Sequence, residues 1–254
     1  MPFFCYTKTM VKKRLDQLLH ERFTGYSGRQ IQSWIMQGKA TVQGRTVTKP
    51  GMMVSEDAVV ELVVEEPKYV SRAGFKLEKI LDHFAIDVAG LTVLDAGIST
   101  GGFTDCLLQR GAKKIYGIDV GYGQVHEKIS HDERVILKER TNLRALTDVG
   151  EKVDLVTLDL SFISILKVMD AVCDLLKSDG TLLTLIKPQF EARREDVGRG
   201  GIIKDSAVHA RVIEEVTQGI KEHGFELVGV IDSPIEGSSG NKEFLAYFKR
   251  IGRI

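Results

Sequence analysis

The stretch Leu91–Gly102, which reads LTVLDAGISTGG, decides the fold class of this chain. Its first residues form an apolar run that is typical of a buried strand, and a glycine-rich turn begins after Asp95. Glycines at the end of a strand let the backbone approach a ligand, and the N-terminus of the next helix favours an anion. The stretch therefore predicts a strand, a ligand-binding turn and a helix, in that order.

Strands and helices continue to alternate after this turn. The expected strands are Leu91–Ala96, Lys114–Asp119, Val135–Lys138, Asp154–Asp159, Thr181–Lys187, Glu226–Ile231 and Phe244–Phe248. The expected helices are Gly102–Arg110, Ile165–Leu176 and Val208–His223. Short apolar strands separated by helices are typical of a sheet that is buried on both faces. The predicted class is α/β, with a doubly wound, Rossmann-like sheet.

The N-terminal residues show a different pattern, of two short helices followed by strands. Ser27 is expected to cap the second helix, Trp34 to lie in the core, and Gln43-Gly44 to form a hairpin turn before a strand over Val59–Val64. A proline after a polar run makes Glu66-Pro67 the best boundary. We therefore expect a small α+β domain over residues 1–66, a linker and first helix over 67–90, and the α/β domain over 91–254.

The charge of the chain is unevenly distributed although its formal net charge is zero. Residues 1–54 contain nine Lys or Arg and only two Asp or Glu. A basic module on an acidic body suggests a polyanionic partner, such as a nucleic acid, at the N-terminal end. The oligomeric state has no signature in the sequence.

The composition excludes several classes of protein. No apolar run approaches the roughly 18–20 residues that a membrane span needs, and the first residues lack the order of a secretory signal. Three scattered cysteines, Cys5, Cys106 and Cys173, have neither metal-ligand nor disulfide spacing. We therefore expect a cytoplasmic protein that has no metal site and no membrane partner.

The basic N-terminal segment resembles a known RNA-binding fold. The residues Lys13-Arg14-Leu15-Asp16, then Ser27 to Trp34-Ile35, then Gly38-Lys39 and Lys49-Pro50-Gly51 are similar to the S4 domain. The resemblance implies a basic helix face that docks on folded RNA. Its phosphate contacts would come from Arg14, Arg29 and Lys39, which would supply salt-sensitive affinity and little base recognition.

The turn after Asp95 favours one type of ligand over two others. It lacks the Gly-x-Gly-x-x-Gly pattern of dinucleotide folds, and no Gly-Lys-Ser/Thr of a P-loop follows. Asp95 would repel a pyrophosphate but attract the ammonium and sulfonium charges of S-adenosylmethionine (SAM). The next strand ends in Asp119, where an acid can accept hydrogen bonds from an adenosine ribose. A glycine-rich turn without a ligand remains the alternative.

Charged residues mark the ends of several predicted elements. Asp159 and Lys187 end two strands, Glu243 precedes the last strand, and Lys76 lies in Ser71-Arg72-Ala-Gly-Phe-Lys76. The carboxyl ends of neighbouring parallel strands open on one crevice. We therefore expect these four side chains to converge there.

The order Lys, Asp, Lys, Glu resembles the catalytic tetrad of the FtsJ-type ribose 2′-O-methyltransferases. The whole chain resembles the TlyA family, also called haemolysin A, which joins an S4 domain to that catalytic domain. The resemblance rests on Ser71 to Leu77, Leu94 to Asp105, Asp119 to Gln124, Glu139 to Asn142, Lys187 to Glu191 and Gly198 to Gly201.

This resemblance implies SAM-dependent 2′-O-methylation of a cytidine ribose in ribosomal RNA, with ribosomal subunits as partners. The large subunit is favoured, and the small subunit stays open as the alternative. Arg72 would add an RNA contact. The SAM contacts would come from Asp95, Gly97, Ser99, Thr100, Gly101, Gly102, Phe103, Asp119 and Asn142. Ile98 stands where the family usually has a small residue, and Val125-His126-Glu127 replaces a more apolar stretch.

A ribose hydroxyl is a weak nucleophile, so the reaction needs in-line positioning and help with one proton. Lys187 is expected to contact the 2′-hydroxyl, either as a base or, while protonated, as a partner of the developing alkoxide. The two acids, Asp159 and Glu243, would orient the two lysines. The rival interpretations are an RNA-binding protein without catalysis, a base methyltransferase and a membrane-active haemolysin.

Overall fold

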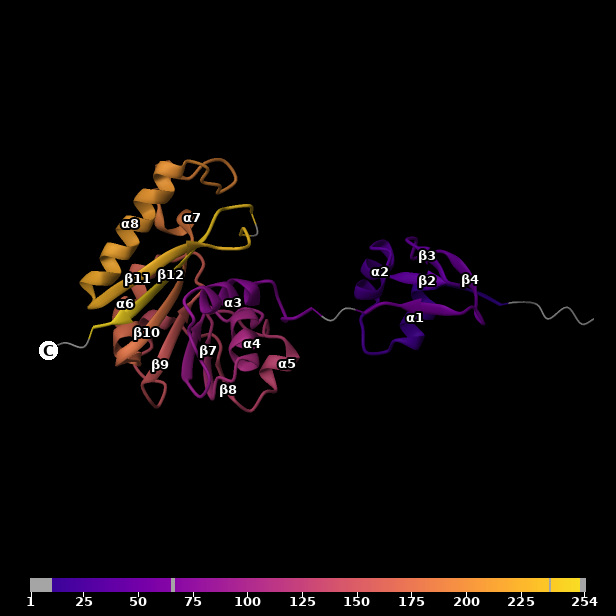
Figure 1. Ribbon diagram of the computed structural model, residues 1–254, viewed down its shortest axis with the longest axis horizontal. Coiled ribbons are helices and arrows are strands. Elements are labelled where there is room, and N and C mark those ends of the chain that lie inside the picture. Colours follow the sequence, from indigo (N-terminus) through magenta and orange to yellow (C-terminus); the bar gives the residue numbers. More distant parts are fainter. Residues whose placement is uncertain (1–10, 65–66, 238, 252–254) are drawn as a thin grey trace, which may run out of the picture. The chain divides into compact units, whose positions relative to one another are not determined.

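The computed structural model describes residues 11–64, 67–237 and 239–251. The chain divides into two compact units, Met1–Glu66 and Pro67–Ile254, which are labelled by element in Figure 1. Each unit has its own hydrophobic core.

The N-terminal unit packs two helices against short antiparallel strands. Its elements are β1 (Lys12–Arg14), α1 (Leu15–Arg22), α2 (Gly28–Met36), β2 (Ala40–Val42), β3 (Arg45–Val47), β4 (Met53–Ser55) and β5 (Val60–Leu62). β1 pairs with β4, and the other three strands form a sheet in the order β3-β2-β5. The pairing of β1 with β4 was not expected from the sequence, because each strand has only three residues and little alternation of apolar side chains.

Local signals explain the two helices and the hairpin of this unit. Ser27 and Gln30 form a reciprocal capping box at the start of α2, as the sequence predicts for Ser27. Gln43 and Gly44 both adopt positive φ angles of 53° and 73°, which suits the tight turn between β2 and β3. Trp34 is partly buried and packs against the apolar core, in agreement with its predicted place.

The C-terminal unit is built on a seven-stranded sheet in the order β11-β12-β10-β9-β6-β7-β8. The strands are β6 (Thr92–Ala96), β7 (Lys114–Ile118), β8 (Val135–Lys138), β9 (Val153–Leu158), β10 (Leu176–Ile186), β11 (Phe225–Asp232) and β12 (Phe244–Arg250). β12 lies antiparallel between β10 and β11, and the pairs β10-β9, β9-β6, β6-β7 and β7-β8 are parallel. This sheet confirms the predicted α/β class.

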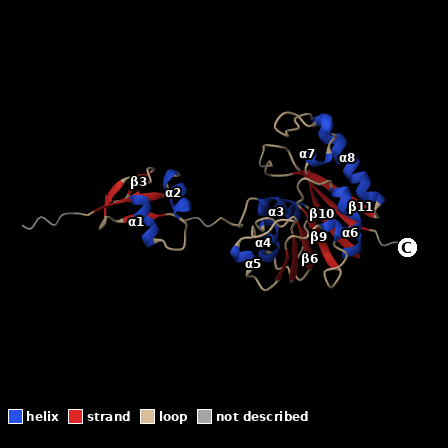
Figure 2. Cartoon of the chain, turned by 180° about the vertical axis from the view of Figure 1, so that it is seen from behind, coloured by secondary structure: helices blue, strands red, loops and turns tan. Residues whose placement is uncertain are grey.

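Helices cover both faces of the sheet, which Figure 2 shows from behind. The helices are α3 (Ala73–His83), α4 (Gly102–Gln109), α5 (Glu127–Ser130), α6 (Met169–Leu175), α7 (Pro188–Glu191) and α8 (Ser206–Glu222). Residues of α3 and α4 join one core cluster, and residues of α6 and α8 join the other. All five residues of β6 are buried, as a central strand between two layers requires.

The structure corrects two predicted boundaries. The helix expected over Ile165–Leu176 begins as a 3-10 helix, η2 (Ile165–Val168), and continues as α6, which ends at Leu175. β10 begins at Leu176 rather than Thr181, with a register shift against β9 between these two residues. Apolar periodicity does not predict this extension, because residues 177–181 are polar or glycine.

The order of the strands places the ligand site. From β6 the chain adds β7 and β8 on one side and then returns to add β9 on the other, so the switch point lies between β6 and β9. Ligands of such sheets bind outside the carboxyl ends of the strands at this point. Within the described residues, no helix combines the length and the apolar character that crossing a bilayer requires.

Candidate active site

The turn after β6 lies directly against the backbone at the end of β9. Gly97 has a φ of +82°, and a Cβ at this position would lie 2.5 Å from the backbone oxygen of Asp159, which follows β9. Ser99 and Gly101 also have positive φ angles, of 49° and 95°. Only a residue without a side chain fits between the ends of β6 and β9, so Gly97 is required here by both space and conformation.

Asp95 of β6, which lies two residues before Gly97, is fixed by hydrogen bonds to two threonines. Thr104 Oγ1 donates to one of its carboxylate oxygens at 2.7 Å, and Thr157 Oγ1 donates to the other at 2.8 Å. The residue is fully buried, and this burial raises the pKa of Asp95 to about 6. Asp95 lines neither of the two cavities described below, so its direct contact with SAM stays a prediction, and the structure gives it a supporting place.

Ile98 is accommodated by a glycine on the neighbouring strand. Its side chain is only 3% exposed, and a Cβ on Gly117 of β7 would lie 2.4 Å from Ile98 Cδ1. The branched residue in the turn thus fills the space that Gly117 leaves open. The sequence showed the unusual residue at position 98 but not its compensation.

Two cavities adjoin each other at the carboxyl ends of the strands. The Asp119 cavity has a volume of about 540 Å³, and Asp119, Asn142, Leu143 and Leu160 are among its lining residues. The tetrad cavity has a volume of about 600 Å³ and is lined by Lys76, Asp159, Lys187 and Glu243 among others. Both cavities share five lining residues, which are Gly97, Ser99, Asp159, Ser161 and Phe162. One ligand can therefore extend from one cavity into the other.

Asp119 fixes the edge of its cavity through backbone contacts. Its carboxylate accepts hydrogen bonds from the backbone N–H groups of Ser99 at 2.8 Å and Gly121 at 2.7 Å. These contacts join the turn after β6 to the loop after β7. Val125, His126 and Glu127, the stretch that departs from the family pattern, do not line the Asp119 cavity.

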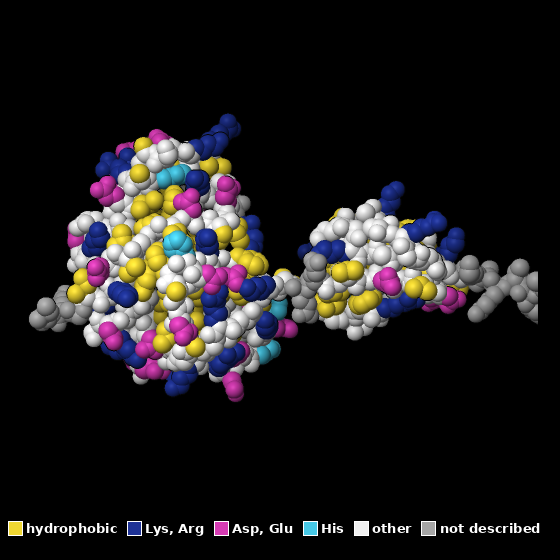
Figure 3. Space-filling view, in the orientation of Figure 1, with side chains coloured by type: hydrophobic (Ala, Val, Ile, Leu, Met, Phe, Trp, Pro, Cys, Tyr) yellow, Lys and Arg dark blue, Asp and Glu magenta, His cyan; other side chains and the backbone are white. Residues whose placement is uncertain are grey.

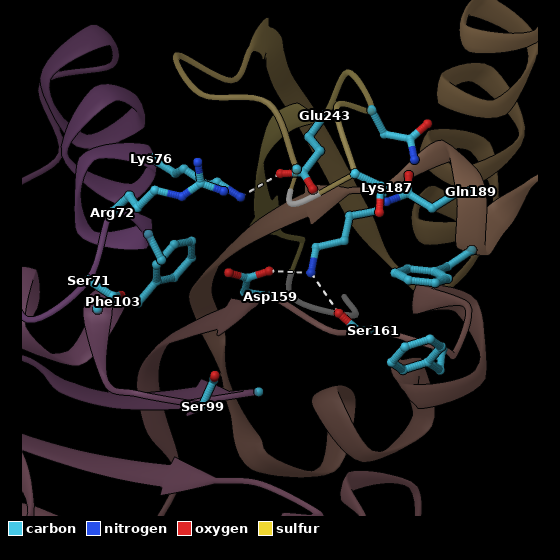
Figure 4. A pocket seen from close by; sticks show the side chains of 18 of the residues that line it. Ser71, Arg72, Lys76, Ser99, Phe103, Asp159, Ser161, Lys187, Gln189 and Glu243 are labelled. Atoms are coloured by element: carbon cyan, nitrogen blue, oxygen red, sulfur yellow. Dashed lines mark hydrogen bonds and ion pairs between the residues drawn. The ribbon is translucent and has the colours of Figure 1, made fainter. Parts of the chain in front are cut away.

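The tetrad cavity contains two ion pairs, drawn in Figure 4. Lys76 Nζ on α3 lies 2.5 Å from Oε2 of Glu243, the residue that immediately precedes β12. Lys187 Nζ, at the end of β10, lies 2.6 Å from Asp159 Oδ1 and donates to Ser161 Oγ at 3.0 Å. The structure thus brings together the four residues that the sequence singled out, and each lysine has its own carboxylate.

The tetrad is shielded from water but reachable from the cavity. Lys76, Lys187 and Glu243 are at most 9% exposed. Charges in such surroundings interact more strongly than in water. The arrangement can hold an ammonium group in a fixed position beside a reacting oxygen, with its charge balanced by a neighbour.

Most of the predicted cofactor residues line one of the two cavities. Gly97, Ser99, Thr100, Gly102 and Phe103 line the tetrad cavity, as does the RNA-contact candidate Arg72, which is exposed. Gly101 lines neither cavity, and a Cβ at this position would lie 3.0 Å from Ile129 Cγ1. The roles of all these residues stay predictions.

The tetrad cavity also has polar and aromatic lining residues that were not selected from the sequence, namely Ser71, Ser161, Phe162, Gln189 and Phe190. Ser71 and Gln189 each carry a buried oxygen without a hydrogen-bond partner. Phe162 is 91% exposed at the mouth, and its ring centroid lies 5.0 Å from that of Phe190. For Ser161 and Gln189 the useful signal would have been their spacing, because each follows a tetrad residue by two positions.

The basic residues of the N-terminal unit differ in their surroundings. Figure 3 shows more Lys and Arg than Asp and Glu side chains on the visible face of this unit. Arg29 is exposed, whereas Arg14 donates two hydrogen bonds to the buried Asp16, at 3.0 and 2.8 Å. The guanidinium of Arg14 lowers the pKa of Asp16. A phosphate that binds Arg14 would therefore have to share its guanidinium group with Asp16.

Comparisons with known proteins agree with both units. Residues 69–250 match the FtsJ-like methyltransferases, and residues 13–60 match the S4 domain. The chain is 41% identical over 241 residues to the 16S/23S rRNA (cytidine-2′-O)-methyltransferase TlyA of Mycobacterium tuberculosis, covering 94% of this chain and 90% of that protein. It is 34% identical over 181 residues to the 23S rRNA (cytidine-2′-O)-methyltransferase TlyA of Campylobacter jejuni, covering 71% and 70%.

A solved structure is similar over nearly the whole chain. A candidate hemolysin from Streptococcus thermophilus has a TM-score of 0.72 and 37% identity, covering 96% of this chain and 90% of that one. This chain and the Streptococcus thermophilus protein therefore share their fold over nearly their whole length.

Proposed function

The chain belongs to the FtsJ-like methyltransferase family, and on that premise we propose that it methylates the 2′-hydroxyl of a cytidine ribose in ribosomal RNA. The observation that carries the proposal is the convergence of Lys76, Asp159, Lys187 and Glu243 in one cavity that adjoins the Asp119 cavity. S-adenosylmethionine is the methyl donor.

The residues of the two cavities fit SAM. Asp119 lines one of them, where its carboxylate can accept hydrogen bonds from the ribose hydroxyls, and Leu143 and Leu160 offer apolar surface to the adenine. In the tetrad cavity the Ser71 hydroxyl is buried and unpaired beside the first residue of α4, since a Cβ on Gly102 would lie 2.3 Å from it. A hydroxyl and a helix N-terminus together suit the carboxylate of the methionine part.

The tetrad supplies the chemistry on the side of the RNA. When bound, SAM provides a methyl group that its sulfonium has already activated. Lys187 Nζ is held by the Asp159 carboxylate at 2.6 Å and by the Ser161 hydroxyl at 3.0 Å, which fixes the position of its hydrogen-bond donors. The proposed role of Lys187 is therefore to stabilise the negative charge that develops on the 2′-oxygen, while the hydroxyl proton is lost to the Asp159 carboxylate or to solvent. Lys76 and Glu243 line the same cavity and add a second, balanced charge pair.

Features outside the tetrad support an RNA substrate. The S4 domain supplies a basic module, and Phe162 and Phe190 place aromatic surface at the mouth of the tetrad cavity. Exposed aromatic rings are suited to stacking an unpaired base. We further propose the large ribosomal subunit as the substrate, because the names of both TlyA relatives include 23S rRNA.

The test is the transfer of labelled methyl from SAM to large and small ribosomal subunits from a strain that lacks this protein, followed by nuclease digestion and nucleoside analysis. The proposal expects label in 2′-O-methylcytidine from the large subunit. Label in the small subunit alone would overturn the choice of subunit, and label in a methylated base would overturn the reaction. Absence of label while SAM still binds would point to an RNA-binding role without catalysis.

The matched control for this assay is a pair of lysine variants. Lys187→Ala should lower the rate by about 10²–10³-fold, the usual cost of removing one donor to a developing negative charge, while SAM binding by calorimetry is retained. Lys221→Ala, on the exposed surface of α8, should leave the rate unchanged. Full activity of the Lys187 variant would remove Lys187 from the mechanism.

A further inference from the structure

Gln189 carries an unused hydrogen-bond acceptor inside the tetrad cavity. It lies on α7, two residues after Lys187, and its Oε1 atom is buried without a hydrogen-bond partner. Figure 4 shows its side chain on the same side of the cavity as Lys187. A buried amide oxygen that stays unpaired is unfavourable, so its presence in a ligand cavity calls for a hydrogen-bond donor on the ligand.

Within the part of the chain that the structure describes, Ser71, Asp159 and Gln189 are the residues lining this cavity with such an atom. Asp159 Oδ1 already lies against Lys187 Nζ at 2.6 Å. Ser71 adjoins Gly102 at the start of α4, on the side assigned to the methionine part of SAM. Gln189, in contrast, lies on α7, which follows β10. Its unpaired oxygen is therefore assigned to a contact with the RNA substrate.

The surroundings of Gln189 point to the base rather than to the sugar. The next residue, Phe190, packs its ring against that of Phe162, so aromatic surface for a base lies directly beside the amide. Within an RNA chain the 2′-hydroxyl is the only donor on the ribose, and Lys187 with Asp159 is proposed to engage it. The remaining donors belong to the bases, and cytosine presents its exocyclic amine where uracil presents a carbonyl.

We propose that Gln189 Oε1 accepts a hydrogen bond from the exocyclic amine of the target cytosine and so selects cytidine over uridine. This assignment rests on the proposed function. It identifies the exocyclic amine of cytosine as the group of the RNA that the tetrad cavity recognises. A site with a buried acceptor discriminates strongly, because a substrate that lacks the donor leaves the acceptor unpaired.

The experiment compares large subunits that carry either the natural cytidine or uridine at the methylated position. The enzymes are the natural protein, Gln189→Met, Gln189→Glu and, as a matched control, Gln218→Met on the exposed surface of α8. The readout is the ratio of kcat/KM on cytidine to that on uridine. SAM binding by calorimetry and the melting temperature report whether each variant is folded.

The proposal expects a cytidine preference of about 10- to 100-fold in the natural protein and in the Gln218 variant. Gln189→Met should lower kcat/KM on cytidine and bring the preference close to one, because methionine has no comparable acceptor. Gln189→Glu should keep the preference whatever its rate, because a carboxylate accepts but does not donate.

Two results would overturn the assignment while the proposed function stands. Equal losses of Gln189→Met on both substrates would place the contact on the ribose or the backbone. A preference for cytidine that is lost in Gln189→Glu would mean that the amide donates rather than accepts. If the natural protein methylates no ribose in either subunit, the proposed function and this assignment both fail.

Discussion

Lys76 Nζ and Glu243 Oε2 lie 2.5 Å apart although 167 positions separate the two residues in the chain. Lys76 is 8% exposed and Glu243 is 5% exposed, so each charge depends on the other for compensation. Removing one member of a buried pair leaves an uncompensated charge, which usually destabilises a protein more than removing both.

This pair predicts a non-additive pattern of stability. Glu243→Gln is expected to lower the free energy of unfolding by about 3–5 kcal/mol, since the Lys76 ammonium then lacks its counter-charge. The double variant Lys76→Met/Glu243→Gln should be less destabilised than the sum of the two single variants. Urea unfolding followed by circular dichroism measures all four proteins, and strictly additive effects would argue against an energetic coupling.

A second prediction concerns the packing of Ile98 against Gly117. Gly117→Ala would bring a methyl group to 2.4 Å from Ile98 Cδ1, so it should destabilise the protein by about 1–3 kcal/mol and weaken SAM binding. Adding Ile98→Ala to Gly117→Ala should restore part of the stability and part of the SAM affinity, because the smaller side chain at position 98 no longer overlaps the new methyl group. The measurements are melting temperature and calorimetric SAM affinity. Equal behaviour of the single and double variants would show that the turn does not depend on this contact.

A third prediction uses the pH dependence of stability. Burial raises the pKa of Asp95 to about 6 in the folded protein, above the ordinary value of 3.8 for an aspartic acid. The protonated form is therefore favoured on folding, and the contribution of Asp95 to stability is complete below about pH 4 and is lost as the pH rises through 6. The free energy of unfolding of the natural protein, relative to Asp95→Asn, should fall by about 3 kcal/mol between pH 4 and pH 7. A difference that stays constant over this range would contradict the shift.

A fourth prediction concerns Phe162, whose ring is 91% exposed. Phe162→Ala should leave the melting temperature nearly unchanged, because little apolar surface is uncovered. Its kcat/KM on ribosomal subunits should fall by about 5- to 100-fold, since base stacking on an aromatic ring contributes about 1–3 kcal/mol. Phe162→Tyr, which keeps a ring, serves as the control. Full activity of the alanine variant would exclude a stacking role.

The sequence by itself determined the features that depend on neighbours along the chain. Apolar runs placed the strands from β6 to β12 to within a few residues, apart from the start of β10, and Ser27 marked the start of α2. The glycines after Asp95 predicted the ligand-binding turn, and the charged residues at the strand ends predicted the tetrad. These signals are local because strand and helix periodicity, capping and tight turns act over only a few positions.

Only the tertiary structure decided which of these residues meet. It paired Lys76 with Glu243 and Lys187 with Asp159, inserted β12 antiparallel between β10 and β11, and turned Asp95 away from both cavities toward two threonines. It also placed the buried oxygen of Gln189 inside the tetrad cavity. Apart from the contact of Asp95 with Thr104, which is nine positions away, these hydrogen bonds and ion pairs join residues up to 167 positions apart. They follow from the order and register of the strands, which no local pattern in the chain encodes.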